Sequence, residues 1–257
     1  MHLRDAAAAL GVHYQTAYGW VREGVLPARK TSRGYEVSDS AVRALAERRL
    51  AGQPPPAGIR VRDWAVQSAR LHDALVAGDE TVARQRLGRL TGSVPVVDLC
   101  GRVIGPALRQ IGDDWAAGLV SIAAEHRAST ICERLIAQAA QQPQGRPRGV
   151  AVVATPPGER HGLPALMAAA CLRQDRWLVH HLACDLPAAE VTGMARATDA
   201  DLVVLSSSTT ASAGLLAEAA AQVEAGSGAR VLCGRPGDTL HDLVRLARSG
   251  APDRAGV

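Results

Sequence analysis

Several kinds of sequence signal are missing from this 257-residue chain. No apolar run approaches the ~20 residues that a helix needs to span a bilayer, so we expect no membrane partner. The five cysteines are odd in number, contain no Cys-x-x-Cys pair and follow no secretory signal. That pattern is typical of buried thiols in a reducing compartment. We therefore expect a cytoplasmic protein.

Lysine is nearly absent, because Lys30 is the single one and arginine supplies the remaining positive charge. The net charge of +4 is modest, but its distribution is uneven. The basic residues between positions 20 and 60 are Arg22, Arg29, Lys30, Arg33, Arg43, Arg48, Arg49 and Arg60. The acidic ones there are Glu23, Glu36, Asp39 and Glu47. A basic N-terminal module fits a polyanionic partner, with a merely solvated basic face as the alternative.

The composition, with 47% hydrophobic and 21% charged residues, is that of an ordinary folded protein. The length suits two or three small cores. Two proline- and glycine-rich stretches, 51–59 and 143–148, read as linkers. They predict three domains, at 1–50, 60–142 and 149–257.

The first domain has the pattern of a helix-turn-helix. Residues 3–10 and 14–23 read as helices that are joined by Gly11-Val12, and Gly24 closes the second helix. Residues 28–37 look like a hairpin, and Ser38 is a plausible N-cap for one more helix. A short glycine-containing turn sets two helices at a steep angle, and the second then enters the major groove of DNA.

These elements resemble the winged helix-turn-helix domain of the MerR superfamily. The stretch AAAALGVHYQTAYGWVREGVLPA and the wing RGYEV carry the resemblance. It implies binding to a double-stranded DNA operator through recognition-helix and wing residues. On the recognition helix these are Tyr14, Gln15, Thr16, Tyr18 and Arg22, and on the wing they are Arg29, Lys30 and Arg33. Packing in the core is the alternative for Tyr18, and it is the favoured one for Trp20.

From 60 to 142 apolar residues recur at three- and four-residue steps, which predicts a four-helix bundle. Asp79 and Ser121 are placed to cap the second and fourth helices, and Gly118 is placed to end the third. Trp115 lies near the end of that third helix. The turn could therefore bring its indole near Glu125 and His126.

After residue 149 the periodicity changes to alternating strands and helices. Strands that are solid runs of Val and Leu are buried on both faces, which predicts a doubly wound parallel sheet with a ligand at the carboxyl ends of its strands. The first strand leads into Gly158-Glu159-Arg160-His161, and no Gly-x-Gly-x-x-Gly dinucleotide motif is present. A glutamate two residues before a histidine can accept one ring N–H and make the other nitrogen a better metal donor.

That half of the chain resembles the cobalamin-binding domain of corrinoid proteins, whose loop carries a D/E-x-H-x-x-G motif. The resemblance implies that His161 is the lower axial ligand of cobalt and that Glu159 orients it, with Gly162 close by. It also implies that Ser206, Ser207 and Gly234 line the slot for the nucleotide tail. The chain departs from the pattern at Pro164 and Cys233, where the family has glycine. A sheet domain that has lost its cofactor is the alternative.

Trp115 and the Glu125-His126 pair resemble the helical cap of light-sensing MerR-type regulators of the CarH and LitR kind. There such residues cover the upper, adenosyl-bearing face of adenosylcobalamin. In several members the residue after the tryptophan is a histidine that binds cobalt once light has removed the adenosyl group. Here that residue is Ala116, so ligation from this position is not expected, and His126 is the nearest substitute.

We therefore expect a multidomain α and α/β chain with a winged helix-turn-helix, a four-helix bundle and a Rossmann-like cobalamin-binding sheet. The expected function is transcriptional regulation rather than catalysis. Adenosylcobalamin photolysis would change the state of a homo-oligomer, a dimer or a tetramer, and with it operator binding. The alternatives are a light-independent sensor of B12 or another tetrapyrrole, a corrinoid methyl carrier, and a DNA-binding protein with an empty C-terminal half.

Overall fold

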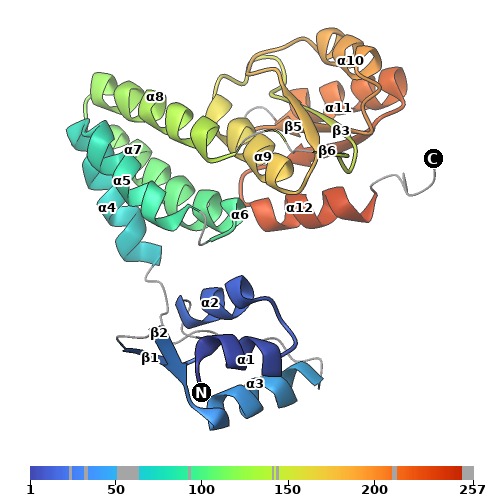
Figure 1. Cartoon of the computed structure of the whole chain (residues 1–257). Helices are drawn as coiled ribbons and strands as arrows, with labels where there is room; N and C mark the ends of the chain where they lie inside the picture. The colour runs from blue at the N-terminus through green and yellow to red at the C-terminus, as the bar shows by residue number, and fades with distance from the viewer. Residues whose placement is uncertain are drawn as a thin grey trace. The chain divides into compact units, whose positions relative to one another are not determined.

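The computed structural model describes residues 1–22, 25–31, 34–50, 64–91, 94–140, 142, 145–209 and 213–250 (Figure 1). The chain divides into two compact units, Met1–Asp63 and Trp64–Val257. The predicted linker 51–59 and Gly24 lie outside the described residues. In the described part of the chain no helix is long and apolar enough to cross a membrane.

The N-terminal unit is a helix-turn-helix with a two-stranded wing. Its elements are α1 (Leu3–Ala9), α2 (Tyr14–Arg22), β1 (Ala28–Thr31), β2 (Gly34–Val37) and α3 (Asp39–Leu50). The two strands pair antiparallel, as the hairpin pattern predicted. Gly11 turns the chain between α1 and α2 at φ +62°, a value that glycine adopts without strain. Leu3, Leu26 and Val37 are buried at the centre of this unit.

The second unit begins with a helical bundle. Its elements are α4 (Trp64–Ala77), α5 (Glu80–Leu90), α6 (Val96–Leu99), η1 (Cys100–Ile104), α7 (Gly105–Ala116) and α8 (Ile122–Ala139). The predicted caps are present: Asp79 accepts the Val82 N–H at 2.9 Å, and Ser121 accepts the Ala124 N–H at 3.2 Å. Gly118 follows α7 with φ +73°, in the left-handed region expected just after a helix end.

The third helix of the bundle is not the single α-helix that the periodicity predicted. It contains a π-helical turn, η1, immediately before α7. Pro106 lies at the start of α7 and has no N–H to continue the helical ladder. Single π turns of this kind occur inside α-helices, and this one directly precedes the residue pair Gly105-Pro106. The apolar side chains before and after the interruption still share one core.

The rest of the unit is a four-stranded parallel sheet in the order β4-β3-β5-β6. Its strands are β3 (Val150–Ala154), β4 (Leu178–His181), β5 (Leu202–Ser206) and β6 (Arg230–Gly234). Its helices are α9 (Gly162–Gln174), α10 (Ala188–Ala197), α11 (Ala213–Ser227) and α12 (Leu240–Ser249). Helices α9 and α12 cover one face and α10 and α11 cover the other, which confirms the doubly wound fold.

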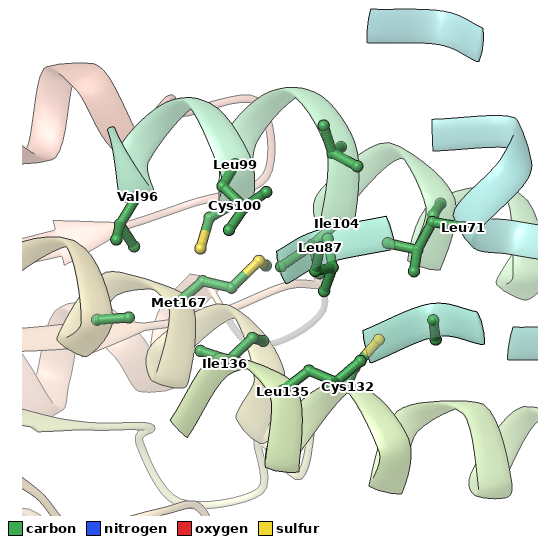
Figure 2. Close-up of a cluster of buried hydrophobic side chains, with 14 of the residues drawn as sticks. Leu71, Leu87, Val96, Leu99, Cys100, Ile104, Cys132, Leu135, Ile136 and Met167 are labelled. Atoms are coloured by element: carbon green, nitrogen blue, oxygen red, sulfur yellow. The ribbon is translucent and has the colours of Figure 1, made fainter. Parts of the chain in front are cut away.

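Helix α9 also belongs to the core of the helical bundle. Met167, Ala170 and Cys171 on α9 are buried in the same apolar cluster as the bundle helices, together with Val244 of α12. Figure 2 shows Met167 among the side chains of Val96, Cys100 and Ile136. The bundle and the sheet are therefore packed through a common helix.

Three of the five thiols are buried, as the cysteine pattern predicted. Cys100, Cys132 and Cys171 are buried, whereas Cys184 and Cys233 are half-buried. Burial raises the pKa of the Cys132 thiol to about 12, which keeps it protonated and unreactive.

One edge of the sheet is blocked by a side chain. The Gln142 amide donates a hydrogen bond to the Val179 carbonyl at 2.6 Å and accepts the Val179 N–H at 3.1 Å. This side chain thus satisfies both peptide groups of Val179, as a neighbouring strand would.

Candidate functional site

The candidate site lies at the carboxyl end of β3, in the loop that leads into α9. His161 is the N-cap residue of α9, and its side chain is 65% exposed. In an open parallel sheet this edge is where ligands bind. A glycine with φ +80°, Gly158, turns the loop directly after the pair of prolines that follows Thr155.

Glu159 fixes the orientation of the His161 ring. The Glu159 carboxylate oxygen Oε1 lies 2.6 Å from His161 Nδ1 and accepts the His161 backbone N–H at 3.0 Å. With Nδ1 as the donor, the unprotonated nitrogen of the neutral ring is Nε2, which is the tautomer that a metal requires. The contact proposed from the Glu-x-His pattern is thus present.

Glu159 is buried although it carries a charge, because donors from a second strand surround it. Its exposed fraction is 2%. Ser208 donates its backbone N–H to Oε2 at 2.8 Å, and the Ser207 hydroxyl donates to the same oxygen at 3.1 Å. Burial alone would raise the pKa of Glu159, but the His161 and Ser208 backbone donors and the His161 side chain lower it to about 2. Glu159 therefore stays ionised and ties the β3 loop to the end of β5.

The donor set fits a metal that is already held by a macrocycle. In the described part of the chain, no group of three or more His, Cys, Asp or Glu side chains is placed to hold a metal ion. A free ion needs several protein ligands, whereas a corrin fills the equatorial positions itself and leaves an axial one for a single imidazole. His161, with its exposed ring and Nδ1 on a carboxylate, is a side chain that could supply such an imidazole.

The residues expected around the nucleotide tail lie at the ends of neighbouring strands. Ser206 ends β5 opposite Gly234 of β6, and the Ser207 N–H donates to the Gly234 carbonyl at 2.9 Å. A Cβ built on Gly234 would lie 3.7 Å from Ser206 Oγ, which is ordinary contact. Cys233 packs against the core of the α10–α11 face.

The second departure from the corrinoid pattern, Pro164, lies in the first turn of α9, where a proline without an N–H is tolerated. Nearby, a Cβ built on Gly162 would lie 3.9 Å from Cys184 Sγ. Pro164 is therefore compatible with a helix that starts directly after His161.

The expected cap residues lie at the α7–α8 turn. Trp115 is 49% exposed in the last turn of α7, so it is not part of the bundle core. Leu119 and Ile122 in the same turn are also exposed. This solvent-facing apolar group is suited to covering an apolar surface.

Glu125 and His126 lie on the first turns of α8. Glu125 Oε2 is 2.5 Å from His126 Nδ1, and the Ser129 hydroxyl donates to Glu125 Oε1 at 2.8 Å. His126, like His161, has Nδ1 on a carboxylate and an exposed ring, its side chain being 72% exposed. The prediction did not include Ser129.

Sequence reasoning also missed three residues around His161: Ser208, Thr155 and Asp185. The run of serines after β5 was a visible signal for Ser208. Thr155 directly follows β3 and is buried, and Asp185 lies in a different loop. A shallow hollow of about 470 Å³ lies away from His161, between Val97 and the α12 residues His241, Val244, Arg245, Arg248 and Ser249.

The described residues that we expect to contact DNA lie on α2 and β1. Tyr14, Gln15 and Thr16 are exposed at the start of α2. Tyr18 is half-buried against the core and stacks on Tyr14, with ring centroids 6.2 Å apart. Trp20 also packs against the core, as favoured from the sequence. The remaining expected residues are Arg22 at the end of α2, Arg29 and Lys30 on β1, and Arg33, which lies outside the described residues.

Tyr35 was not predicted. Its ring meets Tyr18 edge-on at 5.8 Å, which joins the recognition helix to the wing through aromatic contacts.

Comparison with known families gives three matches. Residues 1–50 match a helix-turn-helix domain, and residues 67–139 and 149–251 match two B12 binding domain models. The last two correspond to the helical bundle and to the sheet.

Two known proteins illustrate the likeness. The HTH-type transcriptional repressor CarH of Myxococcus xanthus is 27% identical over 233 residues, which cover 78% of this chain and 76% of that protein. The monomethylamine corrinoid protein of Methanosarcina barkeri matches with a TM-score of 0.55 and 14% identity, over 72% of this chain and 98% of that one. This second likeness is one of fold.

Proposed function

We infer that this helix-turn-helix protein with a two-part B12-binding module is a cobalamin-dependent transcriptional regulator. Its domain matches and its similarity to a transcriptional repressor support this. We propose further that its cofactor is adenosylcobalamin, that light changes its oligomeric state, and that DNA binding changes with it. In this proposal the chain regulates and does not catalyse.

One observation carries the cofactor assignment. The His161 ring has Nδ1 on the buried Glu159 carboxylate and is exposed at the carboxyl edge of a parallel sheet. In this proposal His161 presents Nε2 to cobalt, and Glu159 holds the ring in the required tautomer. Ser206, Ser207 and Gly234 border the slot for the nucleotide tail.

The light response is proposed for the other face of the cofactor. Bound adenosylcobalamin supplies a light-labile cobalt–carbon bond. Trp115 and its apolar neighbours shield the adenosyl group from water, and Glu125 with His126 offers polar contacts to it. Exposed apolar side chains at this turn would otherwise face solvent, so ligand contact there stabilises one arrangement of the module.

The DNA-binding half acts through multivalency. A homo-oligomer, dimer or tetramer, joins several winged domains and raises operator affinity through effective concentration. Binding should weaken steeply with salt, because arginine and lysine displace counterions from phosphates. If Arg29 and Lys30 contact phosphates, replacing either with alanine should reduce the log–log salt slope by about one.

The cofactor assignment is tested by reconstituting the protein with adenosylcobalamin in darkness and recording its visible spectrum. Wild type should show the band of a histidine-ligated, base-off corrinoid, and His161→Ala should lack it. His241→Ala, which changes a half-exposed histidine on α12, is the matched control and should resemble wild type. Identical spectra for wild type and His161→Ala would refute the axial role of His161. No corrinoid spectrum in wild type would indicate an empty C-terminal half.

Light scattering of the loaded protein before and after green or blue irradiation tests the light response. A change of mass on irradiation is expected. A specific observation favours the alternative of a light-independent B12 sensor: Ala116 stands where a light-state ligand would be. An unchanged mass, with DNA binding that depends on cobalamin alone, would establish that alternative. Methyl transfer by the purified chain would establish a corrinoid carrier instead.

A further inference from the structure

The loop between β4 and α10 has an unusual backbone. Ala183 has φ 63° and Asp185 has φ 59°, although neither is glycine. L residues rarely adopt this left-handed conformation, and they keep it only where surrounding contacts impose it. Such strain is often found beside functional sites, so the contacts that impose it matter here.

Those contacts are made to the loop that carries His161. The Asp185 carboxylate oxygen Oδ1 accepts the Gly158 N–H at 2.8 Å. The Asp185 N–H points to Thr155 Oγ1 at 2.9 Å and to the Glu159 carbonyl at 3.1 Å. Asp185 Oδ2 also lies 3.7 Å from Arg160 Nε, an exposed ion pair, so Asp185 contacts the loop at four residues.

Thr155 completes the arrangement from the inside. Its side chain is fully buried, and its hydroxyl donates to the Glu159 carbonyl at 2.6 Å while accepting from Asp185. The Thr155 N–H donates in turn to the Ala183 carbonyl at 3.3 Å. The backbone of Glu159 is therefore fixed by one set of contacts, and its carboxylate is fixed by another, from Ser207 and Ser208.

We propose that Asp185 is a positioning residue for His161: it locks the β3–α9 loop in the conformation that presents the imidazole to cobalt. This rests on the proposed function, and it adds a residue from a loop that carries none of the predicted ligands. Asp185 acts through Gly158 and Glu159 and does not itself touch the metal.

The physical consequence concerns a competition for one axial position. Free cobalamin has its own nucleotide base, which His161 must replace. Loss of the Asp185 carboxylate leaves the Gly158 N–H without this acceptor and lets the loop sample other conformations. Loss of an outer contact to a ligating residue typically weakens metal binding about 10- to 100-fold. We expect the ratio of histidine-ligated to base-ligated cobalamin to fall at least about 10-fold in Asp185→Ala.

The test is electron paramagnetic resonance of cob(II)alamin bound to protein that contains ¹⁵N-labelled histidine. A histidine ligand then splits the cobalt lines into doublets, whereas the ¹⁴N of the nucleotide base gives triplets. Asp185→Asn keeps an oxygen acceptor and tolerates a left-handed backbone, so it should keep the doublets. Asp185→Gly removes the carboxylate and also relieves the backbone strain. If the hydrogen bond from Gly158 to the carboxylate positions His161, this variant should lose the doublets even though the strain is gone.

Asp199→Ala is the matched control. Asp199 is also a left-handed, exposed aspartate, with φ 49°, but it lies at the end of α10. It should leave the doublets unchanged. A second readout uses the cobalamin-free protein: ¹⁵N NMR of the His161 ring should show Nδ1–H as the single tautomer in wild type and a mixture in Asp185→Ala.

The outcomes separate two failures. Triplets in wild type would overturn the axial role of His161 and, with it, the proposed function. Doublets in wild type that persist in both Asp185→Ala and Asp185→Gly, with an unchanged ring tautomer, would overturn the role of Asp185 alone. Doublets that disappear in Asp185→Ala and persist in Asp185→Gly would attribute the effect to strain and would equally overturn the proposed contact.

Discussion

Gln174 Oε1 accepts a hydrogen bond from the Val96 backbone N–H at 2.6 Å. Gln174 is the last residue of α9 and Val96 is the first residue of α6, so the contact joins the sheet to the helical bundle. It also satisfies one of the N–H groups that a helix start leaves without an intrahelical partner. Together with the buried α9 side chains, it indicates that the bundle and the sheet stabilise each other.

Replacement of Met167 tests that mutual stabilisation. Met167 is nearly buried between α9 and the bundle, so Met167→Ala should lower the free energy of unfolding by about 2–5 kcal/mol. Met194 on α10 is 37% exposed, and Met194→Ala should change the free energy of unfolding by less than about 0.5 kcal/mol. Denaturant titration measures both, and similar values for the two variants would contradict the shared core.

Gly149 should not tolerate a side chain. A Cβ at this position would lie 2.7 Å from Asp201 Oδ2 and 2.8 Å from Trp177 Cζ3. We expect Gly149→Ala to destabilise the protein by about 1–3 kcal/mol, because the indole ring would have to move within a packed core.

Gly112 provides the opposite case. It lies inside α7 with nothing within 4 Å of a built Cβ, so Gly112→Ala should stabilise the helix by about 0.5–1 kcal/mol. Thermal melts of the two variants should shift in opposite directions. A rise in the melting temperature of Gly149→Ala would show that this part of the core is looser than described.

Two tryptophans should respond differently to the same change. Trp177 is 1% exposed, so Trp177→Ala should cost about 3–5 kcal/mol of stability. Trp115 is 49% exposed, so Trp115→Ala should leave the unfolding free energy of the cobalamin-free protein nearly unchanged and weaken retention of adenosylcobalamin. Equilibrium dialysis in darkness measures the second effect. Equal retention by wild type and Trp115→Ala would argue against the cap.

Stability should fall with acid through Glu159. Its pKa in the folded protein is about 2, below its ordinary value of 4.5, because backbone and side-chain donors outweigh the effect of burial. Since the folded-state pKa is the lower one, this contribution is fully present above 4.5 and is lost as the pH falls towards 2. In Glu159→Gln the free energy of unfolding should therefore depend less on pH between about 5 and about 3. Urea titrations of the cobalamin-free protein measure this, and parallel pH profiles would contradict it.

Local sequence signals predicted much of this fold because their causes are local. Caps such as Asp79 and Ser121 act on amides three residues away, and the solid apolar run of β3 can be buried only inside a sheet. Glu159 and His161 are two residues apart, so their contact was readable from spacing. The π turn before Pro106 was missed, because a single inserted residue leaves the three- and four-residue spacing of apolar side chains on each side of it unchanged.

Other parts of the site depend on tertiary contacts that no local pattern indicates. Asp185 reaches Gly158 from a loop 27 residues away, and it does so from a left-handed backbone conformation that no local pattern indicates. The Ser208 N–H meets Glu159 because β5 is adjacent to β3, and strand order is a property of the whole sheet.

The side-chain amide of Gln142 has a consequence for self-association. Because it occupies both peptide groups of Val179 that face outwards from β4, a strand from another copy cannot form a regular ladder there. If the proposed homo-oligomer forms, its copies should therefore not pair strand to strand along the β4 edge at Val179. At that edge, contacts between copies would have to be made by side chains, and such contacts can separate without breaking a row of backbone hydrogen bonds.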